Sequence, residues 1–133
     1  MTKKATIATS DAAPAVGPYA QGTRLGEFLF VSGQLPIAPS GGQMPEGVEA
    51  QTHQSLQNLK AVLAAGGAGL EDVLKTTVFL KDMNDFPVMN RIYAEYFSSA
   101  YPARSTIEVA RLPRDALVEI EAIAAVPDSS HGA

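Results

Sequence analysis

Apolar side chains recur at helical spacing in two segments of the chain. In residues 48–65 they fall on one stripe, with Glu, Gln and Lys side chains off it, and Gly66-Gly67 supplies a stop. In residues 86–97 a second stripe follows Asp and Asn residues that can cap a helix, and Pro87 fits the first helical turn. The pattern predicts two amphipathic helices, whose apolar stripes are core positions rather than cofactor contacts.

Alternating and β-branched segments predict strands before and between these helices. A turn at Gly26-Glu27 joins two of them into a hairpin, and the Pro- and Gly-rich stretch 34–47 is expected to be a surface loop. The glycines of residues 66–69 do not predict a phosphate loop, because they follow a helix and lack the Lys-Ser/Thr ending. These strands are predicted at residues 3–9, 23–25, 28–33 and 72–80.

Near the end of the chain, two alternating runs flank a short connector and predict a final β-hairpin over residues 102–125. Because strand side chains point alternately to opposite faces, Arg104 and Thr106 share one face of the first run, and Glu119 and Glu121 share one face of the second. With a tight connector, Thr106 is expected opposite Glu119 and Arg104 opposite Glu121. The hairpin then gathers a guanidinium and one or two carboxylates, although an ordinary solvated surface strand can carry the same charges.

The predicted order of elements is β, ββ, α, β, α, ββ, which indicates an α+β domain with two helices packed on one face of a mixed sheet. A single domain is expected over residues 1–126, followed by a flexible polar tail at 127–133. The sheet face without helices must be solvated or buried. Because only 18% of the residues are charged, burial against other subunits is the expected arrangement.

Size and composition support one globular domain. A chain of 133 residues buries roughly two-thirds of its unfolded surface, which is enough for a core without disulfides. The absence of cysteine from the sequence excludes thiolate nucleophiles and cysteine-held metal ions. His53 and His131 are too isolated in the sequence for a metal cluster, so both are expected at the surface, and neither a metal nor another cofactor is expected.

The charge balance bears on partners and location. With a net charge of −4 and a pI near 5.0, the chain lacks the clustered Lys and Arg that bind phosphate backbones, so nucleic acid is not an expected partner. The first residues contain no apolar run long enough for a signal peptide, and no stretch approaches the roughly 20 apolar residues of a membrane span. We therefore expect a cytoplasmic protein that does not bind a membrane.

Five blocks of sequence, in order and spread over nearly the whole chain, resemble the RidA (YjgF) family of reactive intermediate imine deaminases. No single block would suffice, but their joint order and spacing make the resemblance specific. The blocks are GPYAQG at 17–22, VSGQLP at 31–36, QTHQSLQNLKAVL at 51–63, KTTVFLKDMNDFPVMNRIYAEYF at 75–97 and PARSTIEVARLPRDALVEIEAIA at 102–124.

The resemblance implies a chorismate-mutase-like fold and a homotrimeric barrel of sheets, with the helices outside and small pockets at the subunit interfaces. It also implies a reaction that needs no cofactor. Family members hydrolyse 2-imino acids and their enamine tautomers, such as 2-aminoacrylate and 2-iminobutanoate, to 2-keto acids and ammonia. This removes intermediates that would otherwise damage pyridoxal-phosphate enzymes.

Carried over to this chain, the resemblance assigns the central roles to three residues. Arg104 would hold the substrate carboxylate through two parallel charge-assisted hydrogen bonds. Glu119 would deprotonate the water that attacks the imine carbon, and would help return a proton to the departing ammonia. Thr106 occupies a position where many relatives have cysteine, so a hydroxyl would contact the substrate there.

Four further residues have an ordinary interpretation and a functional one. From the residues alone, Tyr19 is a packing anchor in a loop or a ligand contact, and Ser32-Gly33 is a turn at a strand end or a close approach to a ligand. Asn90 beside the second apolar stripe either forms a structural hydrogen bond to a neighbouring loop or contacts a ligand. The resemblance implies that Tyr19 closes the pocket, that Ser32 and Gly33 line it, and that Asn90 lies in the shell that positions the loop.

A second hypothesis is a non-catalytic keto-acid-binding or regulatory trimer that uses the same pocket. Arg104 together with Glu119 favours the enzyme, because a protein that only binds a carboxylate has little reason to place a second carboxylate beside its arginine. Ribonuclease or chaperone behaviour, described for some family members, finds little support in an acidic chain without a basic aromatic face. An inference of chorismate mutase activity from the fold alone would be analogy.

Overall fold

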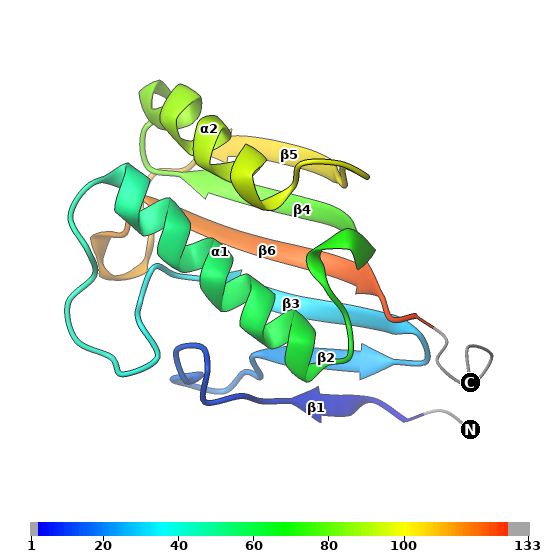
Figure 1. Ribbon diagram of the computed structural model, residues 1–133. Helices are drawn as coiled ribbons and strands as arrows, with labels where there is room; N and C mark the ends of the chain where they lie inside the picture. The colour runs from blue at the N-terminus through cyan, green and yellow to red at the C-terminus, as the bar shows by residue number, and fades with distance from the viewer. Residues whose placement is uncertain (1–2, 128–133) are drawn as a thin grey trace.

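Six strands form one sheet, and both helices pack on the same face of it (Figure 1). The computed structural model describes residues 3–127, so most of the predicted tail (127–133) and His131 lie outside the described residues. The strand order is β1-β2-β3-β6-β4-β5, with β4 and β5 parallel and the other neighbours antiparallel. The elements are β1 (Ala5–Ile7), β2 (Gly22–Leu25), β3 (Phe28–Gln34), α1 (Val48–Ala65), η1 (Leu70–Asp72), β4 (Val73–Leu80), η2 (Met83–Asp85), α2 (Phe86–Tyr96), β5 (Ala103–Glu108), η3 (Pro113–Asp115) and β6 (Val118–Ala125).

The core lies between the two helices and the sheet, at the positions that the sequence pattern predicts. Leu56, Leu59 and Val62 of α1 are fully buried, and so is Met89 of α2. The sheet contributes the alternate residues of its strands, and Leu29 of β3 is among them at 0% exposure. Each fully buried side chain of this size contributes about 1.5–3 kcal/mol through removal from water. The two predicted helices and the α+β class are therefore confirmed.

The predicted final hairpin is wrong, although both of its strands form. β5 pairs in parallel with β4, and β6 lies between β3 and β4, so β4 separates the two strands that were expected to be neighbours. Arg104 pairs with Thr76 and not with Glu121. The expected pairing of Thr106 with Glu119 does not occur either, because Glu119 faces a residue of β4.

The composition of the two strands explains this arrangement. β6 carries apolar side chains on both faces, for example Ala122 and Ile123, which suits a strand in the middle of a sheet. β5 is polar and largely exposed, which suits an edge. The helix α2 provides the crossover that the parallel β4–β5 pair requires, and residues 109–117 form a connection much longer than a tight hairpin turn.

The face of the sheet away from the helices is open and partly apolar. Phe28 and Phe30 of β3 project from it at 44% and 45% exposure, and Ile107 of β5 at 44%. Within one chain this sheet is not closed into a barrel.

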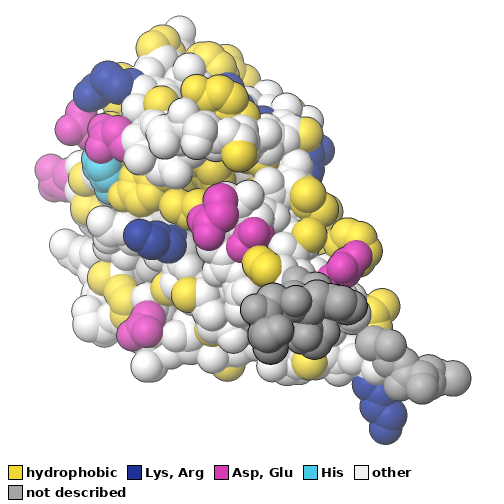
Figure 2. Space-filling model, turned by 45° about the vertical axis from the view of Figure 1, so that its right-hand side comes forward, with side chains coloured by type: hydrophobic (Ala, Val, Ile, Leu, Met, Phe, Trp, Pro, Cys, Tyr) yellow, Lys and Arg dark blue, Asp and Glu magenta, His cyan; other side chains and the backbone are white. Residues whose placement is uncertain are grey.

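On the side of the molecule seen in Figure 2, basic side chains are scattered among acidic and apolar ones. Within residues 3–127, no helix combines the length and apolarity needed to span a membrane.

Candidate functional site

A cavity of about 650 Å³ lies where the loop after β1 meets the end of β3 and the start of β6. Four of the residues predicted for the site line it, although the sequence separates the first from the last by a hundred positions. This is the largest grouping of predicted site residues in the described part of the chain. The four are Tyr19, Ser32, Gly33 and Glu119.

Glu119 projects into this cavity because of its position in β6. Its neighbours Val118 and Ile120 are both 0% exposed on the helix-covered face, so strand alternation directs Glu119 to the open face. Burial of its carboxyl raises its pKa above the usual value, and the nearby negative charge of Glu121 raises it further. A carboxylate with a raised pKa is a stronger base than an ordinary surface glutamate, as general base catalysis requires.

A bulge at the end of β3 brings the backbone close to Glu119. The register shifts between Val31 and Gln34, and the two residues between them are Ser32 and Gly33. A Cβ on Gly33 would lie 2.6 Å from Oε2 of Glu119, so only glycine permits the present position of the carboxylate. The Ser32 hydroxyl donates to the carbonyl oxygen of Ala20 at 2.6 Å, which ties the bulge to the loop that carries Tyr19.

Tyr19 forms the outer wall of the cavity and is 52% exposed. Its hydroxyl accepts a hydrogen bond from the backbone nitrogen of Val16, at 3.4 Å. Gln21, which was not predicted from the sequence, holds this loop in place. Gln21 is 5% exposed, and its side-chain amide bonds to the backbone of Thr9 through both its oxygen and its nitrogen, and to the carbonyl oxygen of Ala13.

Arg104 lies outside this cavity, on the helix-covered face of the sheet. Its guanidinium carbon is 4.7 Å from the centre of the Tyr93 ring and 5.5 Å from that of Phe86, and both rings belong to α2. Since β4 lies between β5 and β6, the backbones of Arg104 and Glu119 are roughly 10 Å apart across the sheet alone. A single chain therefore does not bring the predicted carboxylate anchor and the predicted base together.

Thr106 and Asn90 lie on the Arg104 side of the molecule. Thr106 follows Arg104 on the same face of β5, and its Oγ1 is buried with no hydrogen-bond partner among the described residues. Asn90 is exposed on α2, about one turn from both Phe86 and Tyr93. Because Asn90 is exposed, the structural hydrogen bond expected for a buried asparagine is not required.

Arg114, which was not predicted from the sequence either, lines the cavity that contains Glu119. Its Nη2 donates to the carbonyl oxygen of Gly42 at 3.2 Å. Arg114 and Asp115 have φ values of 56° and 57°, in a region that residues other than glycine rarely adopt. Asp adopts this region more often than most residues, but nothing in the sequence marks Arg114 itself for it. Glu121 lines the same cavity, so it is not the partner of Arg104 that the sequence led us to expect.

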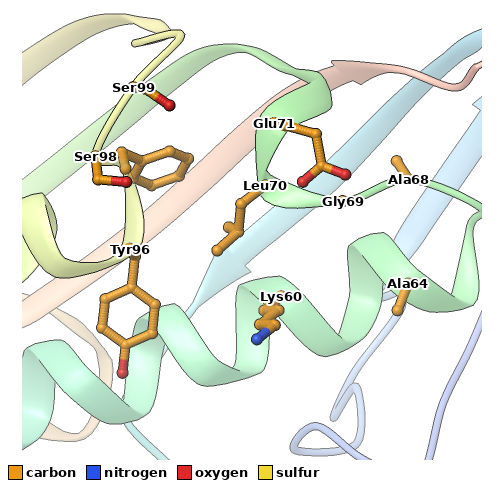
Figure 3. A pocket seen from close by; sticks show the side chains of 10 residues that line it. Lys60, Ala64, Ala68, Gly69, Leu70, Glu71, Tyr96, Ser98 and Ser99 are labelled. Atoms are coloured by element: carbon orange, nitrogen blue, oxygen red, sulfur yellow. The ribbon is translucent and has the colours of Figure 1, made fainter.

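A second cavity, of about 490 Å³, lies between the later turns of α1 and the segment after α2 (Figure 3). It contains Lys60 and Glu71 but none of the predicted site residues. Tyr96 at its edge points toward α1, where its hydroxyl lies 2.9 Å from Nδ1 of the half-buried His53. In residues 3–127, no three His, Asp or Glu side chains are grouped as a metal site requires.

The chain is similar to proteins of known sequence over almost its whole length. Residues 9–126 match the family described as Endoribonuclease L-PSP. The chain is 53% identical over 122 residues to a RutC family protein of Pyrococcus horikoshii, covering 91% of this chain and 97% of the relative. It is 51% identical over 122 residues to the 2-iminobutanoate/2-iminopropanoate deaminase of Escherichia coli K12, covering 90% of this chain and 95% of that enzyme.

Solved structures share the fold at similar identity. The YjgF gene product of E. coli superposes with a TM-score of 0.89 and 49% identity, covering 92% of this chain and 99% of that one. E. coli TdcF with bound serine superposes with a TM-score of 0.88 and 45% identity, covering 91% and 98%. These similarities extend over both strands that carry Arg104 and Glu119.

Proposed function

The chain belongs to the endoribonuclease L-PSP family, which is the RidA (YjgF) family indicated by its sequence, and from this premise we propose that it hydrolyses 2-imino acids to 2-keto acids and ammonia. The predicted enzyme class is confirmed, since relatives 51% identical over 90% of the chain are named 2-iminobutanoate/2-iminopropanoate deaminase. The observation that carries the proposal is the position of Glu119, a half-buried carboxylate with a raised pKa that faces a cavity large enough for a small acid.

The proposed reaction needs one base and one carboxylate anchor. Glu119 takes a proton from water while the water oxygen bonds to the imine carbon, and the electron pair of the C=N bond moves to nitrogen. Glu119 then returns this proton to nitrogen, which gives a carbinolamine. Glu119 next takes the hydroxyl proton and passes it to the amine, so that the C–N bond breaks with ammonia as the leaving group while the carbonyl forms. Water and 2-iminobutanoate thus give 2-oxobutanoate and ammonia. An ordered water beside a positioned substrate supplies the rest of the acceleration.

We assign the carboxylate anchor to Arg104 of a second copy of the chain. Within one chain, Arg104 and Glu119 face opposite sides of the sheet, so a site that uses both must be shared. The open face, with the exposed rings of Phe28 and Phe30, is the apolar surface that copies of the chain would cover for one another. A homotrimer with three shared sites, as the resemblance implies, satisfies both requirements.

Arg114 is the alternative anchor, because it is the arginine that lines the Glu119 cavity within the same chain. Its guanidinium already donates to Gly42, and its removal would open the loop that contains this glycine. Arg104 has no carboxylate within salt-bridge distance among residues 3–127, so its charge is available to a substrate. We therefore favour Arg104.

The test generates 2-iminobutanoate in situ and follows its loss with wild type, Arg104→Ala, Glu119→Ala and Arg114→Ala. Wild type is expected to accelerate the loss, Glu119→Ala to lose on the order of 10²–10⁴-fold in rate, and Arg104→Ala to lose substrate affinity. Absence of acceleration by wild type would refute the proposed function. Full affinity in Arg104→Ala combined with weak binding in Arg114→Ala would transfer the anchor to Arg114.

The non-catalytic alternative, a trimer that only binds keto acids, makes a different prediction for Glu119. Such a protein would bind 2-oxobutanoate without accelerating imine loss, and Glu119→Gln would bind it at least as tightly because a negative charge near the ligand is removed. The raised pKa of Glu119 is of no use to a protein that only binds, which is why we place this function second.

A further inference from the structure

The surroundings of Arg104 are more constrained than a substrate anchor alone would need. The guanidinium lies over two aromatic rings of α2, with its carbon 4.7 Å from the centre of Tyr93 and 5.5 Å from that of Phe86. Phe86 and Tyr93 are seven residues apart, so two helical turns place both rings on the same side of α2. Arg104 is held against this pair from the edge strand β5.

The Tyr93 ring is itself held on three sides. Its hydroxyl shares a hydrogen bond of 2.8 Å with Oγ1 of Thr76, and Thr76 is the residue of β4 that pairs with Arg104. Its other neighbour is Phe97, whose ring centre is 4.6 Å away at an interplanar angle of 32°. Tyr93 is 6% exposed and Phe97 is 2% exposed, so neither ring has room to turn. Burial also raises the pKa of Tyr93, which keeps its hydroxyl neutral.

Arg104, Thr76 and Tyr93 each contact the other two. Strand pairing places Arg104 beside Thr76, Thr76 fixes the hydroxyl of Tyr93, and the face of Tyr93 returns to Arg104. A guanidinium held over two ring faces has fewer orientations open to it than a free one, and its N–H groups that point away from the rings can bind a carboxylate with two parallel hydrogen bonds. A lysine ammonium on the same surface would have no preferred plane.

We propose that Thr76, Phe86 and Tyr93 are positioning residues that hold the Arg104 guanidinium in one plane and thereby set the affinity of the site for the substrate carboxylate. The inference rests on the proposed function, since it assumes that Arg104 is the anchor. It goes beyond that function in assigning a part in carboxylate recognition to buried and half-buried residues of the helix-covered face. Phe86 and Tyr93 contact Arg104 from α2, and Thr76 lies beside it on β4.

The kinetic test compares Tyr93→Leu and Tyr93→Phe with wild type in the turnover of 2-iminobutanoate. Loss of the ring in Tyr93→Leu is expected to raise KM on the order of tenfold, with kcat within about twofold of wild type. Tyr93→Phe keeps the ring and is expected to restore most of the lost affinity. Tyr96→Leu is the matched control, because Tyr96 lies on the same helix but points toward α1 and the second cavity (Figure 3), and its KM is expected to be that of wild type.

A binding measurement separates positioning from a general loss of structure. Calorimetry with 2-oxobutanoate and with the uncharged 2-oxobutanamide gives the preference of each variant for a carboxylate. In Tyr93→Leu this preference is expected to fall on the order of tenfold, because only the charged ligand depends on the orientation of Arg104. If the variant lost affinity for both ligands equally, Tyr93 would be structural only and the inference would be overturned.

If Tyr93→Leu fails to fold, Thr76→Val decides the matter, since it removes one hydroxyl with little change in shape. Its KM is expected to rise about threefold, as loss of one hydrogen bond to a neutral group would allow. An unchanged KM in Thr76→Val, with an active wild type, would then overturn the inference. A wild type that shows the carboxylate preference but does not accelerate imine loss would refute the proposed reaction and leave the positioning role intact.

Discussion

The contact between Gly33 and Glu119 predicts that a single methyl group reduces activity without unfolding the protein. In Gly33→Ala the new Cβ would lie 2.6 Å from Oε2 and 2.8 Å from Cδ of Glu119. The carboxylate oxygen must therefore retreat by about 0.8 Å to reach an ordinary contact of 3.4 Å. The side chain can make this movement, because its end is half-buried in a cavity and is not packed in the core.

The expected result is a large effect on rate and a small effect on stability. A displacement of about 1 Å in a reacting group costs on the order of 10²-fold in rate, so kcat is expected to fall by 10–100-fold. The backbone at Gly33 is outside the left-handed region, so alanine adds no strain there, and the unfolding free energy is expected to change by less than about 1 kcal/mol. Imine turnover and urea unfolding of the same preparation measure the two quantities.

Gly66→Ala is the matched control for this substitution. Its Cβ would also meet a side chain at 2.6 Å, but that side chain is Leu29, which is 0% exposed in the core. We expect Gly66→Ala to lose about 1–3 kcal/mol of unfolding free energy and to keep the kcat of wild type per folded molecule. Wild-type kcat in Gly33→Ala would show that the position of Glu119 against the bulge is irrelevant to the chemistry.

Three further predictions concern charge and the loop. Glu121→Gln removes a charge that raises the pKa of Glu119, so the acidic limb of the kcat/KM pH profile should shift to lower pH; an unmoved limb would show that Glu119 is not the titrating base. Because the pKa of Glu119 is raised in the folded protein, Glu119 stabilises the fold below its unfolded-state pKa, and this contribution is lost as the pH rises through the folded-state pKa. In urea unfolding, Glu119→Gln should therefore gain stability relative to wild type as the pH rises from acidic to neutral. A difference that does not change with pH would contradict this. Asn58→Ala leaves the carbonyl oxygens of Leu35 and Ile37 without the amide that donates to them, and should lower the unfolding free energy by about 2–3 kcal/mol in urea unfolding. A loss below about 0.5 kcal/mol would show that water replaces the amide.

Local patterns in the sequence predicted the two helices, the strands and the alternation of side chains within each strand. Alternation in β6 placed Glu119 on the opposite side from Val118 and Ile120, as the structure confirms. Periods of two and of 3.6 residues follow from backbone geometry, so they can be read without knowledge of the neighbours. The same reasoning, joined to the family resemblance, selected the four residues that line the main cavity.

Strand neighbours were harder to predict, because pairing depends on distant segments. The assumption that consecutive strands form a hairpin placed Arg104 beside Glu121, whereas insertion of β6 between β3 and β4 puts the two residues on opposite faces of the sheet. Arg114 and Gln21 were missed for a similar reason. The first depends on an unusual turn conformation, and the second on a buried amide whose partners are backbone atoms.

Complementation between two impaired variants, assayed at low substrate concentration, tests most directly whether the chain is an imine deaminase with shared sites. Arg104→Ala and Glu119→Gln chains are co-expressed with different tags, the mixed assemblies are isolated, and the loss of 2-iminobutanoate is followed. In a ring of three where each site takes one residue from each of two neighbours, every mixed trimer contains one site in three with both residues intact. We therefore predict about a third of wild-type activity from the isolated mixed trimers, well above that of either parent. Activity no higher than that of the parents would contradict the shared site.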